Sequence, residues 1–301
     1  MPPTPQACIV SDTKHSFAMN RRRLLCAGST LAVAAPALVS YVAASSRTLH
    51  PGWTGARVIE ERETQFGRIA VLEKGRTRYL AYGPGTQFVY QSAVDLDRPH
   101  ELAAPYMRLM MLGVVYAKPY ARIVQVGVGA GNMTGYTMRT FPDATVHAID
   151  IDRDVLELGG RYFGLSPHPR LHVHLDDGRR WLERSKDVFD IIMLDAYDDV
   201  SIPAPLTGAD FFRIVAARLA PWGALMQNVY TPQVNQRQLR AAIGACFDQI
   251  DVYRVGGSDV LAAYQGPRKS VEELRLRARS LDKSLRPPHS LEKLLEFRVP
   301  S

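Results

Sequence analysis

Residues 123–132 read Ile-Val-Gln-Val-Gly-Val-Gly-Ala-Gly-Asn, an apolar run that ends in a turn with three glycines. Such a run is typical of a buried strand, and the glycines let the backbone turn sharply and approach a ligand. The next residues, Met133–Thr140, have a helical pattern, and the first turn of a helix offers free N–H groups. A glycine-rich turn is a weak signal on its own, so its meaning depends on the residues that follow.

Apolar strands and helices alternate after this turn. We expect strands at 123–126, 146–149, 171–173, 191–194 and 224–229, and helices at 133–140, 155–163, 178–184 and 210–219. This alternation predicts an α/β fold with a methyltransferase-like, doubly wound and mostly parallel sheet. Two more strands, near 250–255 and 260–264, have no long helix between them and suit an antiparallel edge.

The region before the sheet has a different pattern. Short strands are expected between residues 57 and 94, with turns at Glu73-Lys74-Gly75-Arg76 and Gly83-Pro84-Gly85, which predicts a small antiparallel β-unit. Residues 99–116 have apolar side chains at helical spacing, Tyr106 among them. We therefore divide the chain into a leader at 1–46, a β-strand unit at 47–98, and a Rossmann-like nucleoside-binding domain at 99–301. Its tail, 270–297, is expected to form one or two surface helices broken at Pro287-Pro288.

The leader has the composition of an export signal. Asn20-Arg21-Arg22-Arg23-Leu24-Leu25 precedes a stretch rich in Ala, Leu and Val that ends in Val42-Ala43-Ala44. The arginines followed by two leucines resemble a twin-arginine signal, so we expect export to the periplasm by that machinery, or a membrane anchor. The alternative is a cytoplasmic protein with a leader-like N-terminus.

The net charge of +7 does not indicate nucleic-acid binding. Residues 1–46 carry four basic side chains against one acidic, and residues 266–301 carry nine against five, so the middle of the chain is close to neutral. The basic tail is interpreted as a solvated helical surface. The three cysteines have no metal-ligand spacing. His168, His172 and His174 are close in sequence, and the last two would share a strand face, but no further ligand cluster accompanies them, so no metal is expected.

Acidic residues follow three of the expected strands. Asp150 and Asp152 follow the second strand, Asp177-Gly178 the third, and Asp195-Ala196-Tyr197-Asp198-Asp199 the fourth. Ligands bind at the carboxyl ends of strands in open α/β sheets, where such carboxylates can accept hydrogen bonds from ribose hydroxyls and an adenine amino group. Each acidic residue alone is equally suited to cap a helix, but several in register favour a nucleoside site.

An NAD dehydrogenase is the obvious competitor on this fold. Its pyrophosphate turn is usually G-x-G-x-x-G, whereas here the third glycine, Gly131, comes one residue early. The acidic residues after the third and fourth strands also have no role in dinucleotide binding. A nucleoside-sulfonium ligand is the better interpretation.

With these motifs, the chain resembles the polyamine aminopropyltransferases (spermidine synthases). The resemblance runs from about Val58 to Val229 and is carried by the following segments: Pro99-His100-Glu101, Gly127–Asn132, Asp150-Ile151-Asp152, Asp176-Asp177-Gly178, Phe189–Asp198, Leu206–Phe212 and Gly223–Gln227. It implies transfer of an aminopropyl group from decarboxylated S-adenosylmethionine to a diamine, usually putrescine, with no metal and no tightly bound cofactor. It also implies a homo-oligomer, a dimer or tetramer built partly through the β-unit.

The resemblance assigns roles by position. Gly127 and Gly129 would lie against the nucleoside, Asp150 would bind its ribose, and Asp177 with Gly178 its adenine. Asp195 would be the catalytic base, because an amine must give up a proton before its lone pair attacks the carbon next to sulfur. His100 and Asp198 would hold the amine, and a dicationic substrate favours an acidic pocket.

Three residues depart from the family pattern. Ala130 stands where the family has an aspartate that recognises the aminopropyl amine, Phe66 replaces a glutamine near the nucleoside, and Asp199 replaces a proline. The loss at Ala130 removes a counter-ion for the transferred group and also a repulsion against the carboxylate of ordinary S-adenosylmethionine. An S-adenosylmethionine-dependent methyltransferase is therefore an alternative. A non-catalytic exported protein that binds a polyamine or nucleoside is another, because neither donor is expected outside the cytoplasm.

Overall fold

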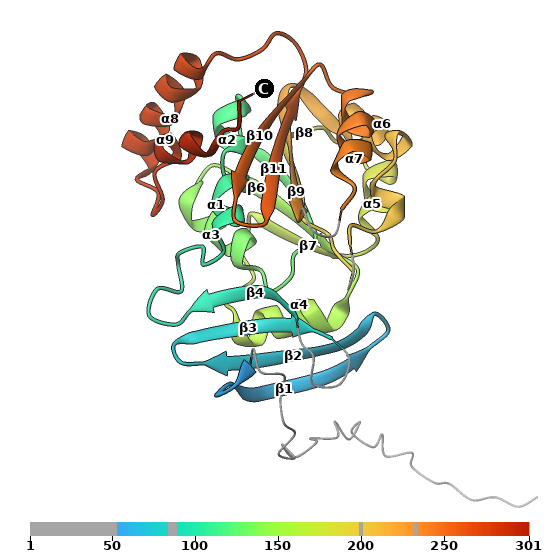
Figure 1. The fold of residues 1–301 in the computed structure, drawn as a ribbon, viewed down its shortest axis with the longest axis vertical. Helices are drawn as coiled ribbons and strands as arrows, with labels where there is room; N and C mark the ends of the chain where they lie inside the picture. The colour runs from blue at the N-terminus through green and yellow to red at the C-terminus, as the bar shows by residue number, and fades with distance from the viewer. Residues whose placement is uncertain (1–52, 84–88, 199–200, 231–233, 301) are drawn as a thin grey trace, which may run out of the picture. The chain divides into compact units, whose positions relative to one another are not determined.

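A computed structural model describes residues 53–83, 89–198, 201–230 and 234–300. The predicted leader and Asp199 lie outside the described residues. The described chain forms two sheets and the helices around them (Figure 1). None of the helices in these ranges is long and apolar enough to span a membrane.

The small sheet is antiparallel, with strand order β1-β2-β3-β4. Its strands are β1 (Arg57–Thr64), β2 (Gly67–Lys74), β3 (Thr77–Tyr82) and β4 (Val89–Asp95). The turn predicted at Glu73–Arg76 is shorter in the structure, because Lys74 pairs with Thr77 and only Gly75 and Arg76 lie between the strands. Gly75 has a φ of +60°, which is a conformation that favours glycine. The predicted β-unit is thus confirmed.

The large sheet has the predicted methyltransferase-like organisation. Its strand order is β10-β11-β9-β8-β5-β6-β7; the pairs from β9 to β7 are parallel, and the two pairs made by β11 are antiparallel. The strands are β5 (Arg122–Val126), β6 (Thr145–Asp150), β7 (Leu171–Leu175), β8 (Phe189–Leu194), β9 (Leu219–Tyr230), β10 (Gln249–Val255) and β11 (Ser258–Tyr264).

Helices cover both faces of this sheet (Figure 1). They are α1 (Pro105–Met110), α2 (Gly113–Tyr116), α3 (Asn132–Thr140), α4 (Arg153–Tyr162), α5 (Gly178–Arg184), α6 (Ala209–Arg218), α7 (Gln236–Gly244), α8 (Val271–Leu285) and α9 (Leu291–Leu294). Side chains of β8 alternate between the faces: Ile191 and Met193 pack with α1, α2, α3 and α8, whereas Ile192 and Leu194 pack with α5, α6 and α7. The core is therefore two apolar layers separated by the sheet.

The segment expected to be one helix over residues 99–116 is not continuous. Helix α1 begins only at Pro105, and Ala104 before it is extended, with ψ at 127°. A residue that precedes proline is disfavoured in the helical conformation, which places the start of the helix at the proline itself. The prediction was wrong for residues 99–104, and this shift sets the position of Tyr106.

The break predicted at Pro287-Pro288 is confirmed, because α8 ends at Leu285 and α9 begins at Leu291. The expectation of surface helices was only partly right. Leu274, Ala278 and Leu281 of α8 are buried in the same apolar layer as α1 and α2. The Arg277 side chain also donates to the backbone carbonyl of Val114, so this helix completes the core.

Candidate active site

The glycine turn after β5 lies between the ends of two neighbouring strands. Gly127 has a φ of +84°, and a Cβ at this position would lie 2.4 Å from the carbonyl oxygen of Asp195. Only glycine fits this conformation and this spacing. The N–H groups of Val128 and Gly129 donate to Oδ2 of Asp150, at 2.8 and 3.2 Å. The structure thus brings Gly127, Gly129, Asp150 and Asp195 together.

Asp150 ends β6 with its carboxylate fixed by backbone groups. Its Oδ1 accepts a third backbone hydrogen bond, from the Asp152 N–H at 3.0 Å. Burial raises the pKa of Asp150, although the three backbone donors act in the opposite direction. A carboxylate has about four acceptor positions, so one remains for a ribose hydroxyl. The ribose-binding role of Asp150 stays a prediction that this geometry allows.

Asp177 and Gly178 form the start of α5 after β7. The Asp177 side chain caps the helix by accepting from the Arg180 N–H at 2.9 Å through Oδ1. A Cβ on Gly178 would lie 2.3 Å from Cγ1 of Val126, so this glycine lets the helix approach β5. Helix capping, the alternative role for an acidic residue here, is therefore present. Acceptance from an adenine amino group would use the second carboxylate oxygen.

Ile151 is an apolar residue that sequence reasoning passed over. It lies between Asp150 and Asp152 and is 45% exposed, although it follows a buried strand. An exposed apolar side chain beside hydrogen-bond acceptors offers a surface for a purine ring. Only the solvent exposure of Ile151 indicates such a contact, because in the sequence the residue continues the apolar run of the preceding strand.

Asp195 follows β8 and has two side-chain partners from distant segments. Its Oδ2 accepts from the Tyr106 hydroxyl of α1 at 3.1 Å, and its Oδ1 accepts from Nδ2 of Asn228 in β9 at 2.8 Å. Burial raises the pKa of Asp195 to about 7, while both hydrogen bonds lower it. A carboxyl group with this pKa can exchange a proton near neutral pH, as a general base requires.

Gln227 and Asn228 of β9 have different hydrogen-bond partners. Asn228 donates to Asp195, whereas Gln227 donates to the backbone carbonyls of Leu194 and Asn228. Tyr106 was predicted only as an apolar helix residue, so its contact with Asp195 was missed.

The two residues expected to hold the amine are exposed. Asp198 forms a small turn, in which its Oδ1 accepts from the Ser201 N–H at 2.7 Å and its own N–H donates to the Ser201 carbonyl at 3.0 Å. His100 lies in the turn that follows β4. Their roles in amine binding stay predictions. Within the described ranges, no group of three or more His, Cys, Asp or Glu side chains is arranged to hold a metal ion.

Ala130 of the glycine turn is fully buried and faces the small sheet. It packs in an apolar cluster with Ile69 and Leu80 of the small sheet and with Val155 of α4. Its N–H donates to the Ser92 hydroxyl of β4 at 3.2 Å. Position 130, where the family resemblance implies an aspartate, is therefore part of an apolar contact between the glycine turn and the small sheet.

Known proteins are similar to this chain in sequence and in fold. Residues 106–253 match the spermine/spermidine synthase domain. A polyamine aminopropyltransferase of Chromobacterium violaceum is 27% identical over 220 residues, which cover 71% of this chain and 83% of that protein. An eEF1A lysine and N-terminal methyltransferase of Bos taurus is 28% identical over 218 residues, which cover 64% of this chain but only 31% of that protein.

A solved structure gives the same fold. The structure of a probable spermidine synthase from Corynebacterium glutamicum aligns with a TM-score of 0.62 at 19% identity and covers 73% of this chain and 86% of that one. Both the parallel sheet and the antiparallel unit before it were expected from the sequence. Residues 106–253 of this chain are therefore similar in sequence to the spermine/spermidine synthase domain, and the fold agrees with that similarity.

Proposed function

We propose that this protein is a polyamine aminopropyltransferase. It transfers the aminopropyl group of decarboxylated S-adenosylmethionine to a diamine such as putrescine and releases spermidine and methylthioadenosine. The observation that carries the proposal is the carboxyl group of Asp195, which is held by Tyr106 and Asn228 directly beside the glycine turn. The polyamine aminopropyltransferase that matches most of this chain supports the same reaction.

The residues of the site account for the chemistry. Asp195 accepts a proton from the attacking amine, whose lone pair then forms a C–N bond to the methylene carbon next to the sulfonium. The C–S bond breaks, and its electron pair stays on sulfur, so neutral methylthioadenosine leaves. A cationic amine near Asp195 lowers the pKa of the carboxyl group and favours the ionised form that acts as a base. Asp198 adds a second negative charge for a dicationic substrate.

Donor selectivity depends on Ala130. With no carboxylate at this position, the site lacks a counter-ion for the aminopropyl ammonium and also lacks a repulsion against the carboxylate of S-adenosylmethionine. Asp195 and Asp198 still disfavour that carboxylate. We therefore expect decarboxylated S-adenosylmethionine to bind more tightly than S-adenosylmethionine. The difference in affinity should be at most about tenfold, which corresponds to at most about 1.4 kcal/mol.

Calorimetric titration with both donors, and with methylthioadenosine in parallel, tests the proposal. Tighter binding of the decarboxylated donor supports it. Equal or tighter binding of S-adenosylmethionine favours the second candidate, a methyltransferase on the same fold, which the alanine at position 130 and the similarity to the bovine methyltransferase support. Binding of none of the three would contradict both and leave the non-catalytic alternative.

We also propose that the protein is exported by the twin-arginine machinery and forms a dimer or tetramer through the small sheet. The leader composition supports export, and the family resemblance supports a homo-oligomer. Cell fractionation tests export: the wild type is expected in the exported fraction. A triple variant, Arg21→Lys, Arg22→Lys and Arg23→Lys, keeps the charge and is expected to remain in the cytoplasm. Wild-type protein in the cytoplasmic fraction would contradict the proposed export. Light scattering of the purified protein tests the proposed dimer or tetramer, and the mass of a monomer would contradict it.

A further inference from the structure

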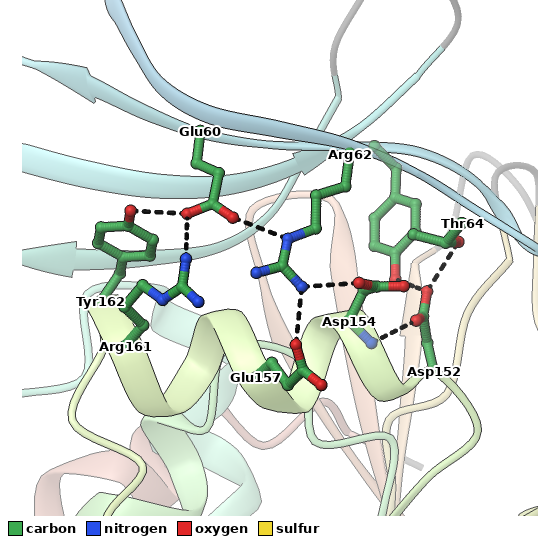
Figure 2. Close-up of polar contacts among 9 residues, drawn as sticks. Glu60, Arg62, Thr64, Asp152, Asp154, Glu157, Arg161 and Tyr162 are labelled. Carbon is green, nitrogen blue, oxygen red and sulfur yellow. Dashed lines mark hydrogen bonds and ion pairs between the residues drawn. The ribbon is translucent and has the colours of Figure 1, made fainter. Parts of the chain in front are cut away.

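A polar network connects β1 of the small sheet to α4 of the nucleoside-binding domain (Figure 2). Arg62 donates through Nη1 to Asp154 at 2.7 Å and to Glu157 at 2.9 Å. Farther along the helix, Glu60 accepts from Arg161 at 2.8 Å and from the Tyr162 hydroxyl at 2.7 Å. These contacts fix the small sheet against one face of α4.

The network continues beyond the ion pairs to Asp152, which is only 4% exposed. Oδ2 of Asp152 accepts from the Thr64 hydroxyl at 3.0 Å and from the Tyr82 hydroxyl at 3.4 Å, both in the small sheet. Its Oδ1 accepts from the Asp154 N–H at 2.9 Å and so caps α4. A buried carboxylate needs such donors, because each one that is lost leaves charge without compensation.

Asp152 in turn holds the predicted ribose-binding residue. Its N–H donates to Oδ1 of Asp150 at 3.0 Å, while Oδ2 of Asp150 accepts from the glycine turn. Thr64 is therefore linked to Asp150 by two hydrogen bonds that meet in Asp152, one to its side chain and one from its backbone N–H. The Thr64 hydroxyl also accepts from the Phe66 N–H at 3.0 Å, so it fixes the β1–β2 turn at the same time.

We propose that Thr64 and Tyr82 are positioning residues for the nucleoside, because they fix Asp152 and, through it, the carboxylate of Asp150. The inference rests on the proposed function only in taking the ligand of Asp150 to be an adenine nucleoside. It assigns to the small sheet an indirect part in donor binding, through Asp152 and Asp150. Since coupling between two sites is reciprocal, a bound nucleoside also strengthens the docking of the small sheet on α4.

Substitution of Thr64 separates this role from a general effect on folding. Thr64→Val keeps the shape and the strand preference but removes the hydroxyl, whereas Thr64→Ser keeps the hydroxyl. Arg57→Gln is the matched control, because Arg57 pairs with Glu73 inside the small sheet, at 2.7 Å, and is largely exposed. The two readouts are calorimetric binding of methylthioadenosine and hydrogen exchange of residues 150–154 in the free protein.

Thr64→Val is expected to weaken methylthioadenosine binding by about five- to twentyfold and to speed exchange of the 150–154 segment. Thr64→Ser and Arg57→Gln are expected to stay within about twofold of the wild type in both readouts. Unchanged exchange in Thr64→Val, or equal effects in Arg57→Gln, would overturn the inference. If wild-type protein does not bind methylthioadenosine, the proposed function fails, and the exchange of the free variants still decides whether Thr64 fixes Asp152.

Discussion

The substitution Asp195→Asn is expected to lower kcat/KM for aminopropyl transfer by about a thousandfold, which is typical for loss of a general base. The amide of this variant cannot accept the proton of the attacking amine, although it has nearly the same shape as the carboxylate. Nucleoside binding should persist, because Asp150 and the glycine turn are unchanged. Product formation, measured by mass spectrometry, and methylthioadenosine binding, measured by calorimetry, check the two halves of this expectation.

The control is Asp187→Asn, just before the opposite end of the same strand, where the side chain is exposed. It makes the same chemical change and should leave transfer unaltered. If Asp195→Asn retains more than about a tenth of wild-type kcat/KM, a thousandfold base contribution is excluded and Asp195 is not the base.

The pKa of Asp195 gives this prediction a pH signature. Because its value in the folded protein is about 7, kcat/KM of the wild type should rise through pH 7 as the carboxylate ionises, and Asp195→Asn should lose this rise.

The free energy of unfolding of the wild type should change in the opposite direction and fall as the pH rises. The folded state holds the proton between the ordinary pKa of 3.8 and about 7, so ionisation destabilises the wild type as pH rises through that window. The melting temperature of Asp195→Asn should therefore be no lower than that of the wild type above pH 7.

The substitution Gly127→Ala is expected to destabilise the protein by about 2–4 kcal/mol and to abolish nucleoside binding. The new Cβ would lie 2.4 Å from the carbonyl oxygen of Asp195 and 2.7 Å from the amide nitrogen of Ala196, and both are backbone atoms that cannot rotate away. The glycine turn and the end of β8 must then separate. Thermal unfolding and titration with methylthioadenosine measure the two effects.

Gly164→Ala is the matched control for this prediction. Gly164 has a φ of +77°, close to the +84° of Gly127, but a Cβ there would have open space around it. The control carries the same conformational strain without the collision, so it should cost about 1 kcal/mol and leave binding intact. Equal losses in the two variants would mean that strain, and not the contact with the Asp195 backbone, explains the need for glycine at position 127.

The sequence predicted the parts of the site that follow from strand order. Gly127, Asp150 and Asp195 each end an apolar run, and the ends of adjacent parallel strands meet at one edge of a sheet. Their proximity therefore required only the correct identification of β5, β6 and β8. The same reasoning singled out Asp177 and gave helix capping as its alternative role, and the structure shows that cap at the start of α5.

The missed residues depend on contacts between distant segments. Tyr106 reaches Asp195 across 89 positions in the chain, and only because α1 starts at Pro105. Thr64, in the small sheet, contacts Asp152, which is 88 positions away in the sequence and follows a strand of the large sheet. Such pairings depend on how the small sheet and the helices dock, which hydrophobic periodicity does not specify. Ala130 was recognised as a departure, but its burial among Ile69 and Leu80 required the structure.

Identification of the thionucleoside product is the most direct test of the account. The purified protein is incubated with putrescine and an equimolar mixture of decarboxylated S-adenosylmethionine and S-adenosylmethionine, and the products are identified by mass spectrometry. Aminopropyl transfer with Asp195 as the base yields methylthioadenosine and spermidine in equal amounts from the wild type, and neither from Asp195→Asn. Formation of S-adenosylhomocysteine without spermidine would contradict aminopropyl transfer and show that the site with Ala130 transfers a methyl group.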